Sequence, residues 1–137
     1  MKILIVEDDE TNRKLLERFL SPFGEIRHAH CGQSALERFK EAHQADSPFD
    51  LICLDIMMPE LDGHTVLKAI RSYETEFGKE GAKVIMTTSL DDSSNVLGAF
   101  KSGCEAYVVK PIDRQTLIHE MQKLGLVAGE PALAERR

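Results

Sequence analysis

Short apolar runs alternate five times with longer stretches whose apolar residues recur at helical spacing, and this alternation constrains the fold more than any other feature of the chain. The runs are a handful of residues long and mostly β-branched or aliphatic, as is typical of strands. Strands separated by helices run parallel, so the pattern predicts a parallel sheet covered by helices. The expected strands are 2–6, 25–29, 50–54, 83–87 and 106–109.

An apolar stripe follows each expected strand and would face the sheet from a helix. Asp113 is a plausible N-cap for the last of these helices, and Gly125 suits its C-terminal stop. The stripes, in chain order, are Leu15, Leu16, Phe19 and Leu20; Ala35, Leu36, Phe39 and Ala42; Val66, Leu67 and Ile70; Val96, Leu97 and Phe100; and Leu117, Ile118, Met121 and Leu124.

The polarity of the expected strands predicts their order. Residues 3–6 and 51–54 are apolar on both faces and should be central, whereas 25–30 carries too many polar groups and should lie at an edge. With right-handed crossovers, this favours the order 2-1-3-4-5. The expected architecture is therefore a doubly wound, flavodoxin-like α/β fold with helices on both faces. Its crevice, beyond the carboxyl ends of strands one and three, is where chemistry is expected.

Composition narrows the class of protein. A chain of 137 residues, 42% hydrophobic and 29% charged, suits one compact domain. We assign this domain to residues 1–125 and interpret 126–137, which holds Gly and Pro but no clear stripe, as a frayed or disordered extension. A net charge of −6 and a pI near 5.4 argue against direct binding of nucleic acid and favour a protein partner.

The sequence indicates neither a membrane segment nor a cysteine-based site. Apolar runs of about eighteen residues do not occur, and the run after Lys2 is too short for a signal peptide, so we expect a cytoplasmic protein. Cys31, Cys53 and Cys104 are odd in number and lack C-x-x-C spacing. They therefore indicate neither a disulfide framework nor a zinc site.

Polar residues of particular kinds closely follow four of the five expected strands. Asp8 and Asp9 follow the first, Asp55 the third, Thr88 the fourth and Lys110 the fifth. Three carboxylates in one crevice repel one another unless protons or a cation intervene, and an oxygen-only cluster suits a hard ion such as Mg²⁺. With such an ion and Lys110 to neutralise a phosphoryl group, Asp55 is the natural nucleophile.

Each of these residues also has a simpler explanation. An Asp-Asp pair before a helix is often an N-cap, and Asp9 suits both roles. A lone Asp at a strand end is usually a turn former, and Thr before a loop is commonly a local hydrogen-bonder. Four such residues in the one crevice that the topology provides are hard to explain by caps and turns alone.

Four motifs in this order resemble the receiver domains of two-component response regulators. The likeness covers 1–125, nearly the whole chain. The motifs are ILIVEDD at 3–9, DIMMP at 55–59 with Asp62-Gly63, MTTS at 86–89 and YVVKP at 107–111.

The resemblance implies the metal ligands and the phosphoacceptor. Asp8 and Asp9 match the acid pair that holds Mg²⁺, directly or through water. Asp55 matches the phosphoacceptor, which also ligates the metal, and Met57 matches the residue that contributes its backbone carbonyl to the ion.

The resemblance also implies a switch. Thr88 and Lys110 match the residues that contact the phosphoryl oxygens, and Tyr107 matches the aromatic that reorients when Thr88 is drawn toward them. Because side chains alternate along a strand, only one of Thr87 and Thr88 can point at the site, and the interval to Lys110 selects Thr88. The Lys110–Pro111 peptide bond is cis in similar proteins.

The function that the resemblance implies is that of a stand-alone receiver, not an enzyme with a separate substrate. It would take a phosphoryl group from a histidine kinase or a histidine phosphotransfer protein. The output surface, formed by the fourth helix, fifth strand and fifth helix, would then bind a protein target that the sequence does not identify. The chain would be a monomer or a phosphorylation-linked dimer. Apolar Met57 and Leu90 beside the site predict a long-lived phosphorylated state. The output surface would include Asn95, Lys101, Tyr107 and Gln122.

The main alternative is a Mg²⁺-dependent phosphohydrolase of haloacid-dehalogenase type, which also works through an aspartyl phosphate. Its usual signature is D-x-D on the first strand. Here the acids of the first strand are adjacent, and the expected nucleophile lies on the third. A flavodoxin-like cofactor binder would need a phosphate-cradling loop after the first strand, where Asp8 and Asp9 stand instead.

Overall fold

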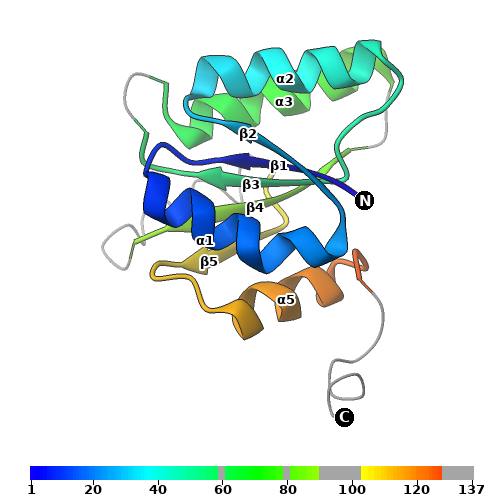
Figure 1. Ribbon diagram of the computed structural model, residues 1–137. Coiled ribbons are helices and arrows are strands. Elements are labelled where there is room, and N and C mark those ends of the chain that lie inside the picture. The colour runs from blue at the N-terminus through cyan, green and yellow to red at the C-terminus, as the bar shows by residue number, and fades with distance from the viewer. Residues whose placement is uncertain (59–60, 79–80, 90–102, 128–137) are drawn as a thin grey trace.

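The computed structural model describes residues 1–58, 61–78, 81–89 and 103–127. Within this part of the chain, the strands form one parallel five-stranded sheet in the order β2-β1-β3-β4-β5, as predicted (Figure 1). The strands are β1 (Lys2–Val6), β2 (Glu25–Ala29), β3 (Leu51–Asp55), β4 (Lys83–Thr88) and β5 (Ala106–Val109).

Helices cover both faces of the sheet, which confirms the doubly wound arrangement. Figure 1 shows α1 and α5 on one face and α2 and α3 on the other. The predicted helix with Val96, Leu97 and Phe100 lies outside the described residues. The described helices are α1 (Glu10–Leu20), the 3-10 turn η1 (Ser21–Phe23), α2 (Gly32–Gln44), α3 (Gly63–Phe77) and α5 (Arg114–Lys123).

Alternate residues of the central strands supply two separate core layers. Ile3 and Ile5 of β1 belong to the layer beneath α1 and α5, together with Leu117 of α5. Leu4 belongs to the layer beneath α2 and α3, which also contains Phe39. These side chains are fully buried, and each contributes about 1.5–3 kcal/mol of transfer free energy. The central strands are therefore apolar on both faces because both faces are covered.

The ends of β3 and β4 differ from the expectation by one residue. β3 spans Leu51–Asp55 instead of 50–54, and β4 continues to Thr88. Asp55 pairs in register with Thr87, and Asp50 uses its carboxylate to accept the Lys2 amide at 2.8 Å. The phosphoacceptor candidate is therefore the last residue of a buried strand rather than part of a loop.

Aspartates begin three of the described helices. Asp9, Asp62 and Asp113 are the N-caps of α1, α3 and α5, and each accepts the amide three residues ahead at 2.9, 3.0 and 2.9 Å, respectively. Each bond satisfies an amide that has no partner within the helix. The N-cap predicted at Asp113 is thus present, and Asp9 is also a cap.

The described chain continues past α5 along the core. Gly125 has a positive φ of 76°, and the Leu126 amide then donates to the Met121 carbonyl at 2.9 Å. Leu126 and Val127 pack, partly buried, against the layer beneath α1 and α5. These first two residues of the predicted extension are therefore packed, while 128–137 lies outside the described residues. Among the described helices, none is long and apolar enough to cross a membrane.

Candidate functional site

Carboxylates from β1 and β3 meet at the carboxyl end of the sheet. Glu7, Asp8 and Asp55 each offer an oxygen, and these oxygens all lie within 4.8 Å of one another. Glu7 is 1% and Asp55 3% exposed, whereas Asp8 is exposed to solvent. Two buried acids and one exposed acid thus form a cluster in the crevice where the sequence predicted the functional site.

Lys110 provides the positive charge of this cluster. Its Nζ lies 3.1 Å from Glu7 Oε1 and 3.3 Å from Asp55 Oδ2. The backbone holds the residue in place, because the Lys110 amide donates to the Thr88 carbonyl at 2.6 Å. The following peptide bond, Lys110–Pro111, is cis, as the resemblance implied. One ammonium therefore bridges the two buried carboxylates.

Glu7, which was not expected from the sequence, joins Asp8 and Asp55 in this cluster, whereas the metal-binding role implied for Asp9 stays a prediction. Asp9 points its carboxylate at the Asn12 amide, and only its backbone reaches the site, where the Asp9 amide donates to Glu7 Oε2 at 3.1 Å. The register between β1 and β3 explains the position of Glu7. Ile5 pairs with Cys53, and extending this register by two residues places Glu7 opposite Asp55.

Met57 borders Asp55 through its backbone. Its amide donates to Asp55 Oδ1 at 3.1 Å, which orients the carboxylate. Met57 is also 59% exposed. The metal-binding role implied for its backbone carbonyl stays a prediction.

The two threonines at the end of β4 have different surroundings. Thr88, the predicted phosphoryl contact, is buried, and its hydroxyl donates to the Ser89 carbonyl at 3.2 Å. Thr87 is the register partner of Asp55, and its buried Oγ1 has no hydrogen-bond partner within the described part of the chain. Tyr107, the predicted switch aromatic on β5, is 39% exposed. A phosphoryl contact by Thr88 thus requires its hydroxyl to leave the Ser89 carbonyl.

Burial and mutual repulsion shift the proton affinities of the cluster. Burial, together with the Asp55 carboxylate, raises the pKa of Glu7 to about 7, although Lys110 opposes the rise. Burial also raises the pKa of Asp55, again opposed by Lys110. For Lys110, burial lowers the pKa, but Asp55 and Glu7 outweigh it and the net shift is upward. One ammonium does not neutralise two buried carboxylates, so the cluster attracts a further positive charge.

This shift predicts a pH dependence of stability. Between pH 4.5 and about 7, folded Glu7 keeps a proton that the unfolded chain has released. The folded state therefore binds more protons, and stability is lost as the pH rises through that window. Glu7→Gln should flatten this part of the profile, measured by urea unfolding in the presence of a chelator. A variant with the same slope as the parent would contradict the assignment.

Comparison with known proteins places the chain in a family. It matches the family model of the response regulator receiver domain over residues 3–122, and the chain belongs to this family. It is 32% identical over 124 residues to the chemotaxis protein CheY of Bacillus subtilis, covering 89% of this chain and 95% of CheY. It is 36% identical over 123 residues to the hybrid signal transduction histidine kinase M of Dictyostelium discoideum, covering 89% of this chain but only 5% of that kinase.

Solved structures agree with this assignment. The receiver domain of Saccharomyces cerevisiae Ssk1, crystallised with the histidine phosphotransfer protein Ypd1, has a TM-score of 0.80 and 27% identity, covering 91% of this chain and 88% of that one. CheY of Borrelia burgdorferi, in a complex with CheX, BeF3 and Mg, has a TM-score of 0.79 and 28% identity, covering 91% and 89%. The strand order and the acidic crevice described above are therefore features of a receiver domain.

Proposed function

We propose that Asp55 accepts a phosphoryl group from a phosphohistidine of a histidine kinase or a histidine phosphotransfer protein. The observation that carries this proposal is the position of Asp55, which is 3% exposed, shares a cluster with the Glu7 and Asp8 carboxylates and pairs with the Lys110 ammonium at 3.3 Å. An Asp55 oxygen attacks phosphorus and forms a P–O bond, the P–N bond to the donor breaks, and its electron pair stays on the histidine nitrogen. The donor classes follow from the family and from the Ypd1 complex of the related Ssk1 receiver.

The residues of the crevice fit Mg²⁺. Glu7, Asp8 and Asp55 offer hard carboxylate oxygens close to one another, and the two buried acids share one cationic partner, Lys110, among the described residues. Mg²⁺ bound there would neutralise the negative charge of the incoming phosphoryl group. Lys110 adds a point charge 3.3 Å from Asp55 Oδ2, and the Met57 amide fixes the orientation of the Asp55 carboxylate.

The affinity for Mg²⁺ should depend on the acids of the cluster and not on the helix cap Asp9. Glu7→Gln and Asp8→Asn each remove a charged oxygen ligand and should weaken Mg²⁺ binding about ten-fold or more. Asp9→Asn keeps a capping side chain and should leave the affinity nearly unchanged. Titration calorimetry on chelator-treated protein measures all three. If Asp9→Asn weakens Mg²⁺ binding as much as Asp8→Asn does, Asp9 is a metal ligand.

Phosphorylation supplies enough free energy to move a switch. The phosphoryl group adds about −1.5 to −2 charge and several acceptor oxygens. Thr88 and Lys110 can each donate to them once the Ser89 carbonyl and Glu7 are released. Charged hydrogen bonds are worth about 1.5–3 kcal/mol each, while two conformers of a switch differ by a few kcal/mol. One or two new bonds therefore suffice to change the populations about ten-fold.

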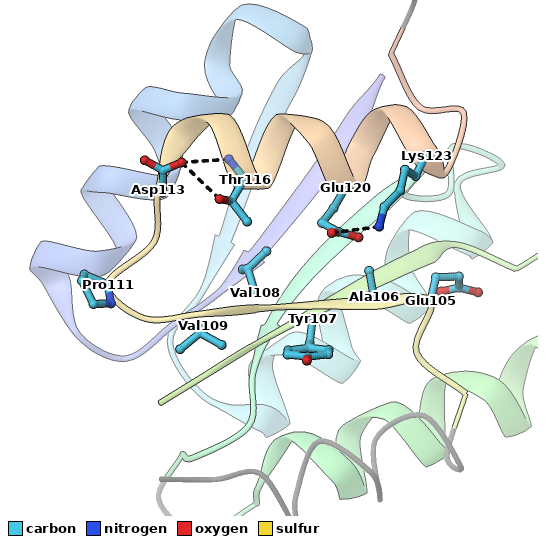
Figure 2. A pocket seen from close by; sticks show the side chains of 10 residues that line it. All are labelled: Glu105, Ala106, Tyr107, Val108, Val109, Pro111, Asp113, Thr116, Glu120 and Lys123. Carbon is cyan, nitrogen blue, oxygen red and sulfur yellow. Dashed lines mark hydrogen bonds and ion pairs between the residues drawn. The ribbon is translucent and has the colours of Figure 1, made fainter. Parts of the chain in front are cut away.

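The described part of the predicted output surface contains a pocket of about 560 Å³ along β5 and α5 (Figure 2). Figure 2 shows Val108 pointing toward α5 and Tyr107 pointing to the opposite side of β5. Glu120 and Lys123 of α5 form an ion pair at 3.2 Å on its rim. A partner that binds this surface would therefore meet both apolar and charged groups. Asn95 and Lys101, which were also expected here, lie outside the described residues.

Tyr107→Ala should uncouple output from phosphorylation. Tyr107 lies on β5, is 39% exposed and is not among the residues of the carboxylate cluster, so Asp55 should still be phosphorylated. A pull-down with and without a phosphodonor, compared between parent and variant, should show that the phosphorylation-dependent change in partner binding is lost. Loss of phosphorylation itself would place Tyr107 in the phosphoryl site instead of the switch.

A small phosphodonor such as acetyl phosphate tests the proposed function directly. With Mg²⁺, the intact protein should gain one phosphoryl group per chain, located on Asp55 by mass spectrometry of peptides. A phosphohydrolase would instead release phosphate continuously from an excess of phosphate ester. Sustained turnover without a stoichiometric labelled protein would therefore overturn the proposal in favour of the enzyme.

A further inference from the structure

Met57 is the exposed member of the five methionines, all of which lie within the described residues. Its side chain is 59% exposed. Met58 is 7% exposed, Met86 and Met121 are fully buried, and Met1 is half-buried against the core. Oxidation of a thioether requires contact between the sulfur and the oxidant, so a dissolved peroxide should reach Met57 first.

The same residue lies beside the candidate phosphoacceptor. Met57 follows Asp55 by two positions, and its amide donates to Asp55 Oδ1 at 3.1 Å. This bond holds the Met57 backbone against the carboxylate that also contacts Lys110. The exposed side chain of Met57 therefore starts from a backbone that contacts the Asp55 carboxylate.

We infer that Met57 is an oxidation site through which peroxides shorten the lifetime of the phosphoryl group on Asp55. The inference rests on the proposed function. A sulfur lone pair attacks one peroxide oxygen and the O–O bond breaks. Sulfur is oxidised to the sulfoxide, and the peroxide is reduced to water or an alcohol. Sulfoxide reductases reverse this modification, so the change is a switch rather than only damage.

The sulfoxide differs from the thioether in the way it interacts with water. The thioether is a weak acceptor and leaves the solvent beside Asp55 unoriented. The sulfoxide oxygen is polar and accepts hydrogen bonds, so it holds water next to the acyl phosphate, which water attacks. One well-placed hydrogen bond that lowers the barrier by about 1 kcal/mol accelerates hydrolysis about five-fold.

The thiols compete weakly for the oxidant. Burial raises the pKa of Cys53 to about 12 and that of Cys104 to about 11, so both stay protonated, and the thiolate is the reactive form. Cys31 is partly exposed and requires a control. Met57→Leu supplies one, because this variant keeps all three thiols while losing only the sulfur at 57.

The first experiment treats the full chain with dilute hydrogen peroxide and follows each methionine by peptide mass spectrometry. Met57 should gain one oxygen before Met58, Met86 and Met121. Treated and untreated samples are then phosphorylated with acetyl phosphate, and phosphate loss is timed after the donor is removed. Oxidised parent should lose phosphate about five-fold faster than untreated parent. Met57→Leu, compared with its own untreated sample, should not change. Met57→Gln, whose amide imitates the polar sulfoxide, should lose phosphate faster than Met57→Leu without any peroxide.

Two results would overturn the inference while the proposed function stands. One is oxidation of Met86 or Met121 ahead of Met57. The other is normal phosphorylation with the same rate of phosphate loss before and after Met57 is oxidised. If untreated protein takes up no phosphoryl group at all, the proposed function fails and this inference fails with it.

Discussion

Replacing Asp55 with asparagine is expected to abolish labelling by a small phosphodonor completely. Asparagine keeps the size of the side chain at this buried strand end, so the sheet should be retained. Its neutral amide lacks the carboxylate oxygen that attacks phosphorus, and no acyl phosphate can form. The measurement is the mass of the intact protein after incubation with acetyl phosphate and Mg²⁺, with circular dichroism to verify folding.

Asp62→Asn is the matched control for this substitution. Asp62 is an exposed aspartate that caps α3 through the Thr65 amide, and asparagine is an equally good N-cap. This variant makes the same chemical change seven positions further along the chain (62 − 55) and should be labelled like the parent. Residual stoichiometric label in Asp55→Asn would move the phosphoacceptor to another carboxylate, with Glu7 and Asp8 the nearest.

Arg71→Ala is expected to lower the free energy of unfolding by about 3–5 kcal/mol. Arg71 of α3 pairs with Glu74 and with Glu105, in both cases at 2.8 Å. It also donates to the carbonyls of Gly103 and Ala82, at 2.8 and 2.9 Å. Truncating it would leave two carboxylates and two carbonyls short of a donor, and the Glu74 side chain is only 6% exposed.

This arginine network ties together elements that are distant in the sequence. Glu74 accepts the Ala82 amide at 2.8 Å and Glu105 accepts the Val84 amide at 2.7 Å, so both acids also hold the start of β4. Gly103, with a φ of 108°, lies so close that a Cβ there would be 3.3 Å from the Arg71 side chain. The network therefore joins α3, β4 and the segment before β5 at the end of the sheet opposite the carboxylate cluster.

Lys14→Ala is the control for Arg71→Ala. Lys14 pairs with Glu10 on the surface of α1, where both side chains are more than half exposed. Solvent screens this pair, so its loss should cost no more than about 0.5 kcal/mol. Urea unfolding at one pH measures both variants. A cost for Arg71→Ala as small as that for Lys14→Ala would mean that the network does not stabilise the fold.

The fold could be predicted because its signals are local. Five apolar runs separated by helical stripes specify a parallel sheet with helices, and the polar run Glu25–Ala29 belongs at the edge, where β2 lies. Asp8, Asp55 and Lys110 were found for the same reason, since each follows an apolar run and parallel strands bring such positions to one edge. These inferences need the identity of a residue and its place relative to a strand, and nothing more.

The missing parts of the site depend on how the elements meet. Glu7 and Asp9 are both acids after β1, and the sequence alone does not say which faces Asp55. The register between β1 and β3 places Glu7 beside Asp55, and the start of α1 turns Asp9 toward the Asn12 amide. Arg71 was missed as well, because its partner Glu105 lies 34 residues away and only packing brings the two together.

The sequence by itself therefore determined the strand order, the crevice and most of the charges that line it, because hydrophobic periodicity and strand polarity are written along the chain. Only the tertiary structure decided which acids share the crevice, that Lys110 bridges Glu7 and Asp55, and that Met57, whose amide contacts Asp55, is exposed. Those contacts join different strands and loops. Register and burial set their distances, and a shift of one residue exchanges the side chains that face the site.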